Sequence, residues 1–150
     1  MYRHGVIRKS ARRSRWIGHL QAFCSSPRLA RGAGLFRARA QLDARPAPLV
    51  TCEAVLSEAF FLLQRVPGGR EALAVLIDRG LLEIRFDFQD EREATLRLLR
   101  KYSDTPMSFA DACLVRMSEL HRSAQVLTLD QDFAAYRRNG RERIPLIAPW

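Results

Sequence analysis

The chain has 150 residues, 47% of them hydrophobic, which is enough for one domain with its own core, and it has no apolar run long enough to span a membrane. Its net charge of +9 is concentrated in residues 1–42, which contain ten basic residues and no acidic ones. In residues 43–150 the other fifteen basic residues and all sixteen acidic residues nearly balance, so the bulk of the chain is not a basic protein.

The N-terminal segment, residues 1–42, is basic and atypical, and its sequence shows no sustained periodicity. Three interpretations are open: a basic arm that contacts nucleic acid, a transit-like leader, or GC-rich DNA translated out of frame. We rank the out-of-frame interpretation first, and otherwise expect a disordered segment. The stretch at 33–44 is predicted to form a helix. We therefore expect a domain boundary between residues 42 and 43.

From Pro46 onward, short apolar runs alternate with amphipathic stretches. We expect strands at 47–52, 81–87, 125–130 and 144–149, and helices at 53–66, 70–80, 89–104, 106–121 and 132–138. Gly80 is expected to end the second of these helices. Strands that alternate with helices indicate an α/β fold with a parallel sheet, in which ligands bind beyond the carboxyl ends of the strands.

Two helix faces are predicted to lie in the core of this fold. The first is formed by Val55, Ala59, Leu62, Leu63 and Val66, and the second by Ala110, Cys113, Leu114 and Met117. The apolar pairs at 60–61 and 62–63 are also expected in the core rather than at an interface.

Cysteine and histidine give little indication of a site. The three cysteines, Cys24, Cys52 and Cys113, are far apart in sequence, so no zinc site or redox pair is expected. The three histidines are scattered and match no metal-ligand spacing. Few cysteines and no apolar signal segment predict a protein of the reducing cytoplasm.

Four acidic residues stand where apolar residues would be expected. Asp130 and Asp132 follow the apolar run "QVLTL", and Glu58 and Asp111 interrupt the helix stretches "AVLSEAFFLL" and "FADACLV". A carboxylate removed from water is costly unless it is partnered. Each acid can have a local partner, such as an arginine or a helix N-terminus. Alternatively, the four converge and share a divalent cation, for which oxygen ligands suit Mg²⁺ or Mn²⁺.

Together, "LVTCEAVLSEAFFLL", "KYSDTPMSFADACLVRMSE" and "VLTLDQDFAAYRRNG" followed by "IPLIAP" resemble the PIN-domain family and, within it, the VapC-type toxins of toxin–antitoxin systems. The resemblance covers residues 46–150 and implies a PIN-like three-layer α/β sandwich with a central parallel sheet. It also implies an endoribonuclease that depends on Mg²⁺ or Mn²⁺, a VapB-like antitoxin partner and a homodimer.

The resemblance assigns roles to individual residues. It implies that Glu58, Asp111 and Asp130 are catalytic metal ligands, that Asp132 is a further ligand, and that Thr128 faces the substrate. It fails at one point, because the family begins with an apolar strand that ends in a metal-binding Asp. Residues 1–42 contain no acid, and Asp43 is a poor substitute, so this first strand is expected to be missing or scrambled.

Two other enzyme classes fit less well. The "DQD" triplet matches the Asp-x-Asp of haloacid dehalogenase-type phosphatases, but that motif opens its fold, and only eighteen residues follow Asp132 here. A response-regulator receiver domain needs a lysine after a late strand, whereas residues 43–150 contain only Lys101. Because the first family Asp is absent, the alternative within the family is a degenerate PIN domain that binds RNA or protein without cleaving.

Overall fold

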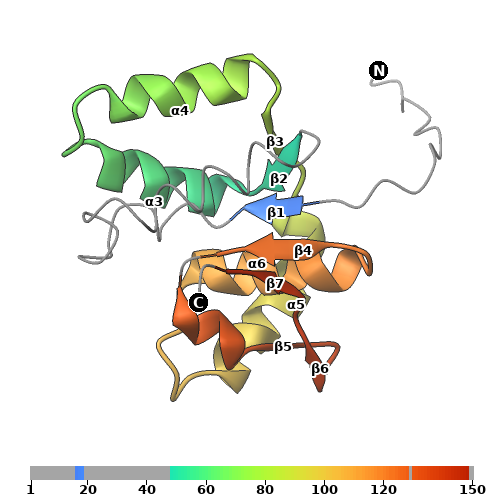
Figure 1. Cartoon of the computed structure of the whole chain (residues 1–150). Helices are drawn as coiled ribbons and strands as arrows, with labels where there is room; N and C mark the ends of the chain where they lie inside the picture. The colour runs from blue at the N-terminus through green and yellow to red at the C-terminus, as the bar shows by residue number, and fades with distance from the viewer. Residues whose placement is uncertain (1–15, 19–47, 129, 149–150) are drawn as a thin grey trace.

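The computed structural model describes residues 16–18, 48–128 and 130–148. A parallel sheet of five short strands lies at its centre, in the order β3-β2-β1-β4-β7 (Figure 1). The strands are β1 (Trp16–Gly18), β2 (Leu49–Thr51), β3 (Leu82–Ile84), β4 (Gln125–Leu127) and β7 (Leu146–Ile147). The predicted α/β class with a central parallel sheet is therefore confirmed.

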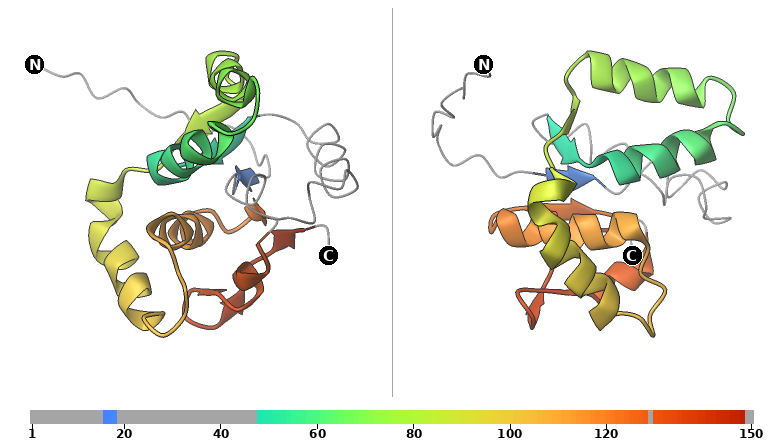
Figure 2. Two further views of the ribbon diagram at one scale, coloured as in Figure 1. Left: turned by 90° about the vertical axis from the view of Figure 1, so that its left-hand side faces the viewer. Right: turned by 180° about the vertical axis from the view of Figure 1, so that it is seen from behind.

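The helices among the described residues are α3 (Glu53–Leu63), α4 (Gly69–Asp78), α5 (Phe88–Lys101) and α6 (Phe109–Leu120). α3 and α6 pack against each other, and α6 also contacts β1 and β4 (Figure 2). α5 packs on α6, and α4 packs on α3 and β3. All four overlap helix stretches expected from the sequence, with ends that differ by a few residues.

α6 forms the centre of the main core. Its predicted apolar stripe, Ala110, Cys113, Leu114 and Met117, is buried as expected. Asp111, Ala112, Val115 and Ser118 are buried too, because the sheet, α3, α5 and β5 (Arg137–Arg138) all contact this helix. The predicted stripe of α3 is only partly correct, because Val66 lies beyond the end of the helix and is 46% exposed.

The first strand, expected to be missing or scrambled, is present, although residues 1–42 carry no acid to match the family's metal-binding Asp. β1 pairs with β2 through Trp16 and Ile17 and with β4 through all three of its residues, so it occupies the middle of the sheet. Tryptophan and isoleucine favour strands, but three residues are too few to show an alternating pattern in the sequence. The predicted helix at 33–44 and the other interpretations of residues 1–15 and 19–42 lie outside the described residues.

The helix predicted at 132–138 is also wrong in its length and type. The chain forms only a short 3₁₀ helix, η2 (Gln131–Ala134), and then a hairpin of β5 and β6 (Glu142–Arg143). Asn139 and Gly140 form the turn with positive φ angles of 48° and 84°. Asn-Gly is a strong hairpin signal, so "RRNGRE" could have revealed this turn in the sequence.

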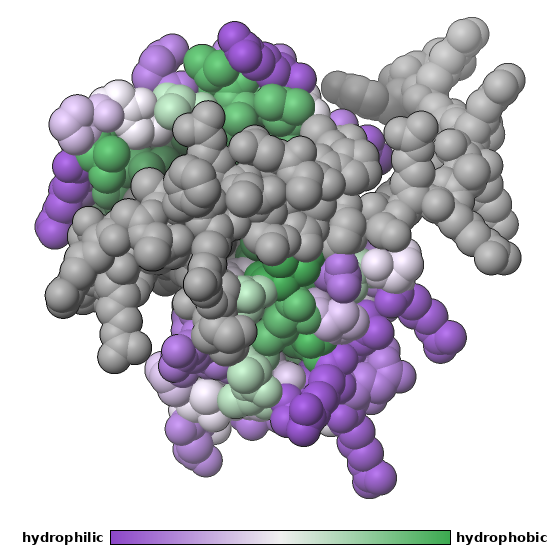
Figure 3. All heavy atoms as spheres, in the orientation of Figure 1, coloured by the Kyte–Doolittle hydropathy of each residue, from purple (hydrophilic) through white to green (hydrophobic). Residues whose placement is uncertain are grey.

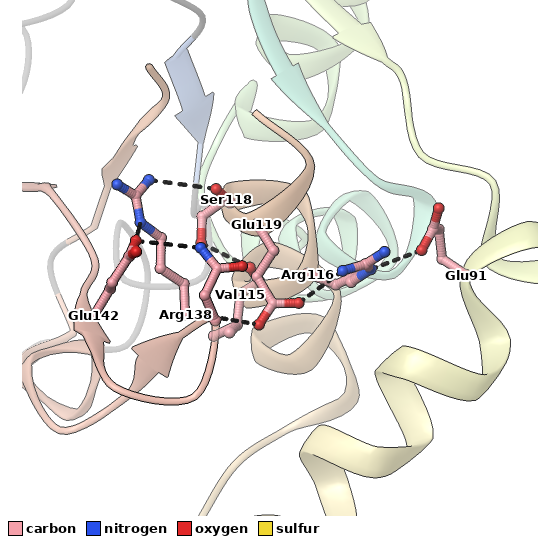
Figure 4. Close-up of polar contacts among 8 residues, drawn as sticks. Glu91, Val115, Arg116, Ser118, Glu119, Arg138 and Glu142 are labelled. Atoms are coloured by element: carbon pink, nitrogen blue, oxygen red, sulfur yellow. Dashed lines mark hydrogen bonds and ion pairs between the residues drawn. The ribbon is translucent and has the colours of Figure 1, made fainter. Parts of the chain in front are cut away.

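Charged side chains fix this hairpin to the helices (Figure 4). Arg116 on α6 bridges Glu91 of α5 and Glu119 of its own helix, at 2.6 and 2.9 Å. The other carboxylate oxygen of Glu119 accepts a hydrogen bond from the backbone N–H of Asn139 in the turn. Arg138 pairs with Glu142 and donates to the Ser118 carbonyl. The hairpin is thus held to α6 through a continuous network.

Several large apolar side chains around α3, α4 and β3 remain at the surface. They are Phe61, Val66, Leu76, Leu81 and Ile84, which are between 39% and 62% exposed. From the viewpoint of Figure 1, apolar surface gathers over the α4 region (Figure 3). Phe61 contradicts the expectation that the apolar pairs at 60–63 lie in the core. Within the described part of the chain, no helix has both the length and the apolarity needed to cross a membrane.

Candidate functional site

The carboxyl end of β4 carries three of the residues singled out from the sequence. Thr128 follows the strand and is fully buried, and its hydroxyl accepts a 3.0 Å hydrogen bond from the backbone N–H of Asp130. One carboxylate oxygen of Asp130 in turn accepts a 2.9 Å bond from the N–H of Asp132 and thereby caps η2. Asp130 is therefore a helix cap, as its turn context suggested, and it stands at the sheet edge where α/β proteins bind ligands.

Asp111 is held at the start of α6 by a reciprocal cap. Its Oδ2 accepts a 2.9 Å bond from the Ser108 backbone N–H, while the Ser108 hydroxyl accepts a 3.1 Å bond from the Asp111 N–H. The side chain is only 3% exposed. A carboxylate in the first turn also interacts favourably with the helix dipole, which offsets part of the cost of burying it. The cap thus fixes the position of a buried negative charge.

Replacing Ser108 with Ala should lower the free energy of unfolding by about 1 kcal/mol, because the hydroxyl half of this capping box is lost. Chemical denaturation of both proteins measures the change. Ser103→Ala, at an exposed position outside any helix, is the matched control and should change stability by less than about 0.5 kcal/mol. Equal effects of the two substitutions would contradict a capping role for Ser108.

The buried phenol of Tyr136 is affected by the charges of three of the candidate acids. The side chain is fully buried and packs edge-on against the rings of Phe133 and Tyr102, each at a centroid distance of 5.3 Å. Burial raises the pKa of the Tyr136 phenol, and the negative charges of Asp111, Asp132 and Asp130 raise it further. The three carboxylates therefore lie near one buried phenol, although Asp111 comes from α6 and the other two come from the β4–η2 segment.

Sequence reasoning overlooked both Tyr136 and Ser108. The spacing of Phe133 and Tyr136, three residues apart, was a signal that two aromatic side chains face the same core. Ser108 three residues before Asp111 matches the capping-box pattern of a short hydroxyl followed by an acid. Neither signal by itself shows that these residues lie next to the candidate acids.

Glu58 lies on α3, whereas Asp111 lies on α6 and Asp130 and Asp132 lie at the start of η2. Glu58 is half-buried on α3, the helix that packs against α6. The pKa of the Cys113 thiol on α6 is raised by a hydrogen bond to Cys52, by burial, and by the negative charges of Cys52, Glu53 and Glu58. The charge of Glu58 therefore acts on Cys113, whereas those of Asp111, Asp130 and Asp132 act on Tyr136.

The four acids supply carboxylate oxygens, the donor type that Mg²⁺ and Mn²⁺ prefer, so their chemistry fits the expected cation. Within residues 16–18, 48–128 and 130–148, however, no three His, Cys, Asp or Glu side chains are grouped so that they could hold a metal ion. β1 adds no acid, since Trp16–Gly18 contains none. The ligand roles assigned to Glu58, Asp111, Asp130 and Asp132 stay predictions.

Comparison with known proteins gives two matches that agree with each other. The family model described as "PIN domain" matches residues 29–139. The chain is also similar to the protein named Ribonuclease VapC26 from Mycobacterium tuberculosis (strain ATCC 25618 / H37Rv), with 31% identity over 109 residues. That alignment covers 71% of this chain and 81% of the relative.

Proposed function

This chain belongs to the PIN-domain family, and from this premise we propose that it is a metal-dependent endoribonuclease and the toxin of a toxin–antitoxin pair. The observation that supports the proposal is that the negative charges of Asp111, Asp130 and Asp132 all raise the pKa of the buried Tyr136. Asp130 and Asp132 follow the carboxyl end of β4, the side on which parallel α/β sheets bind ligands, and the relative at 31% identity is named a ribonuclease.

The proposed metal ligands are Asp111, Asp130 and Asp132, with Glu58 completing the set. When bound, Mg²⁺ or Mn²⁺ would polarise an RNA phosphate and lower the pKa of a water molecule toward neutrality. Without a cation, four carboxylates would repel a phosphate and one another.

The chain's own residues prepare the site. The Ser108 backbone N–H holds the Asp111 carboxylate at 2.9 Å, and the Thr128 hydroxyl fixes the backbone at Asp130. The family resemblance assigns Thr128 to the substrate side, and its buried hydroxyl supports the site by accepting the 3.0 Å bond from the Asp130 N–H. Arginine side chains outside the site would bind the RNA backbone and make its affinity depend on salt.

The proposal extends to domain organisation, location and partners. Residues 43–150 form most of the PIN-like domain, and Trp16–Gly18 of the basic segment 1–42 supplies the central strand β1 of its sheet, so the boundary expected between residues 42 and 43 does not separate two units. We further propose that the protein acts in the cytoplasm. The partner proteins are a VapB-like antitoxin and a second copy of the chain. The exposed apolar side chains around α3, α4 and β3 support protein partners, because exposed apolar residues that cluster often mark contact surfaces.

Mn²⁺ is expected to stabilise the protein if the site is competent. At a concentration about 100 times its dissociation constant, it should add about 2.7 kcal/mol, which raises the melting temperature by about 5 to 10 °C. Differential scanning fluorimetry with and without Mn²⁺ measures the shift. The variant with Asp111→Asn and Asp130→Asn is the control and should show a much smaller shift. An unchanged melting temperature of the native protein would contradict the metal site.

One observation favours a second candidate, a degenerate PIN domain that binds RNA without cleaving it. β1 occupies the middle of the sheet, yet it brings no acid to the carboxyl edge, and the described residues form no three-ligand group. Such a protein would retain RNA in a binding assay while showing neither a response to Mn²⁺ nor cleavage. A catalytic PIN domain should bind RNA, respond to Mn²⁺ and cleave the RNA.

A further inference from the structure

Two cysteines that are distant in sequence lie side by side in the fold. Cys52 is the N-cap of α3, and Cys113 lies in the second turn of α6, which packs against α3. Both side chains are 1% exposed and neither is in a disulfide. The two cysteines line the same cavity, and each thiol perturbs the pKa of the other. The sequence suggested no redox pair because the cysteines are far apart along the chain, and that spacing does not reveal contacts between helices.

The two thiols border a cavity of ≈ 320 Å³ at the start of three helices, α3, α5 and α6. Phe86, Phe88 and Phe109 contribute to its wall, and the last two rings stack edge-to-face at 5.0 Å. This volume is several times larger than a small hydroperoxide molecule. The thiols are thus buried within the protein while still lining a space that a small molecule can occupy.

Cys52 is placed to be the more reactive of the two thiols. Its pKa is lowered chiefly by the hydrogen bond with Cys113 and also by the backbone N–H groups of Val55 and Ala54 at the start of α3. Burial and the charge of Glu53 oppose this effect, but the net direction is downward. Since the thiolate is the nucleophile, a thiol held at a helix N-terminus reacts more readily than one in a purely apolar core.

We propose that Cys52 and Cys113 form an oxidisable dithiol, a modification site at which a hydroperoxide produces a disulfide between α3 and α6. The Cys52 sulfur attacks one peroxide oxygen, the O–O bond breaks, and a sulfenic acid and one molecule of water or alcohol form. The Cys113 sulfur then attacks the Cys52 sulfur and displaces water as the S–S bond forms. Overall, two thiols lose two electrons and two protons, and the peroxide is reduced by the same two electrons.

This chemistry does not depend on the proposed nuclease. The disulfide would join the helices that carry Glu58 and Asp111, so an effect on RNA cleavage is expected only if the proposed function holds. Disulfide formation itself is measured without RNA or metal, so failure of one proposal leaves the other standing.

The test uses the full chain with its thiols reduced, exposed to hydrogen peroxide and quenched with N-ethylmaleimide. Mass spectrometry of a non-reducing digest should find the Cys52 peptide linked to the Cys113 peptide, two hydrogens lighter than the sum of the two. The reductant dithiothreitol should reverse the link. Cys24→Ser should form the same link at the same rate, whereas Cys113→Ser should give a sulfenic acid at Cys52 that dimedone traps.

The folded state supplies the decisive comparison. If the thiols are prealigned, the link should form at least about tenfold faster in the native protein than in urea, where a long loop must close first. The proposal is overturned if the two peptides stay unlinked, if the link forms no faster in the native protein than in urea, or if Cys24 forms mixed disulfides as rapidly. The decisive rates are measured on the wild-type chain, so a serine variant that folds poorly would not change the conclusion.

Discussion

Replacing Asp111 with Asn is expected to reduce RNA cleavage by about a hundredfold or more while the protein stays folded. The neutral amide removes the negative charge that a metal ligand needs, and the loss of such a ligand has effects of at least this size. The amide oxygen can still accept the bond from the Ser108 N–H, which Asp111 Oδ2 accepts at 2.9 Å, so the capping box is largely kept. Stability should fall by less than about 1 kcal/mol, through the weaker interaction with the helix dipole.

The measurement is cleavage of a labelled RNA pool in Mn²⁺, with circular dichroism to verify folding. Asp78→Asn is the matched control, since it makes the same chemical change at an exposed position near the end of α4. Both variants are purified in the same way as the wild type, so a contaminating ribonuclease would cleave equally in all three samples. Cleavage by D111N at the wild-type rate would remove Asp111 from the site and with it the proposed mechanism.

Truncating Tyr136 to Ala should have the largest effect on stability, a loss of about 3–5 kcal/mol in the free energy of unfolding. The side chain is fully buried between Phe133 and Tyr102, so its removal leaves a cavity in the main core. Urea denaturation measures the change. A lower midpoint with an unchanged slope would show that the native fold is retained and only weakened.

Tyr136→Phe separates the ring from the hydroxyl. The hydroxyl makes a long hydrogen bond of 3.5 Å to the Pro106 carbonyl, so its removal should cost no more than about 1 kcal/mol. If Y136F proved as unstable as Y136A, the hydroxyl rather than ring packing would hold this part of the core. If neither variant changed stability, the packing around Tyr136 would not contribute as its burial implies.

Local sequence patterns were sufficient for the helices and the class of fold. The stripe Ala110, Cys113, Leu114 and Met117 has helical spacing, and the run "QVLTL" has the composition of a strand buried on both faces. These features depend on neighbours within a few residues, so their physical causes can be found in the sequence itself. The same patterns failed at β1 and η2, where segments of three or four residues are too short to show a period.

Sequence alone also identified acids that stand out from apolar surroundings, because the cost of burying a charge is a property of the residue and its immediate neighbours. It therefore determined the α/β class and the candidates Glu58, Asp111, Asp130 and Asp132. Only the tertiary structure decided that the charges of three of these acids act on the buried Tyr136 and that Cys52 and Cys113 line one cavity. Such contacts arise when α3, α6 and the segment after β4 pack together, and no local periodicity encodes which distant side chains then meet.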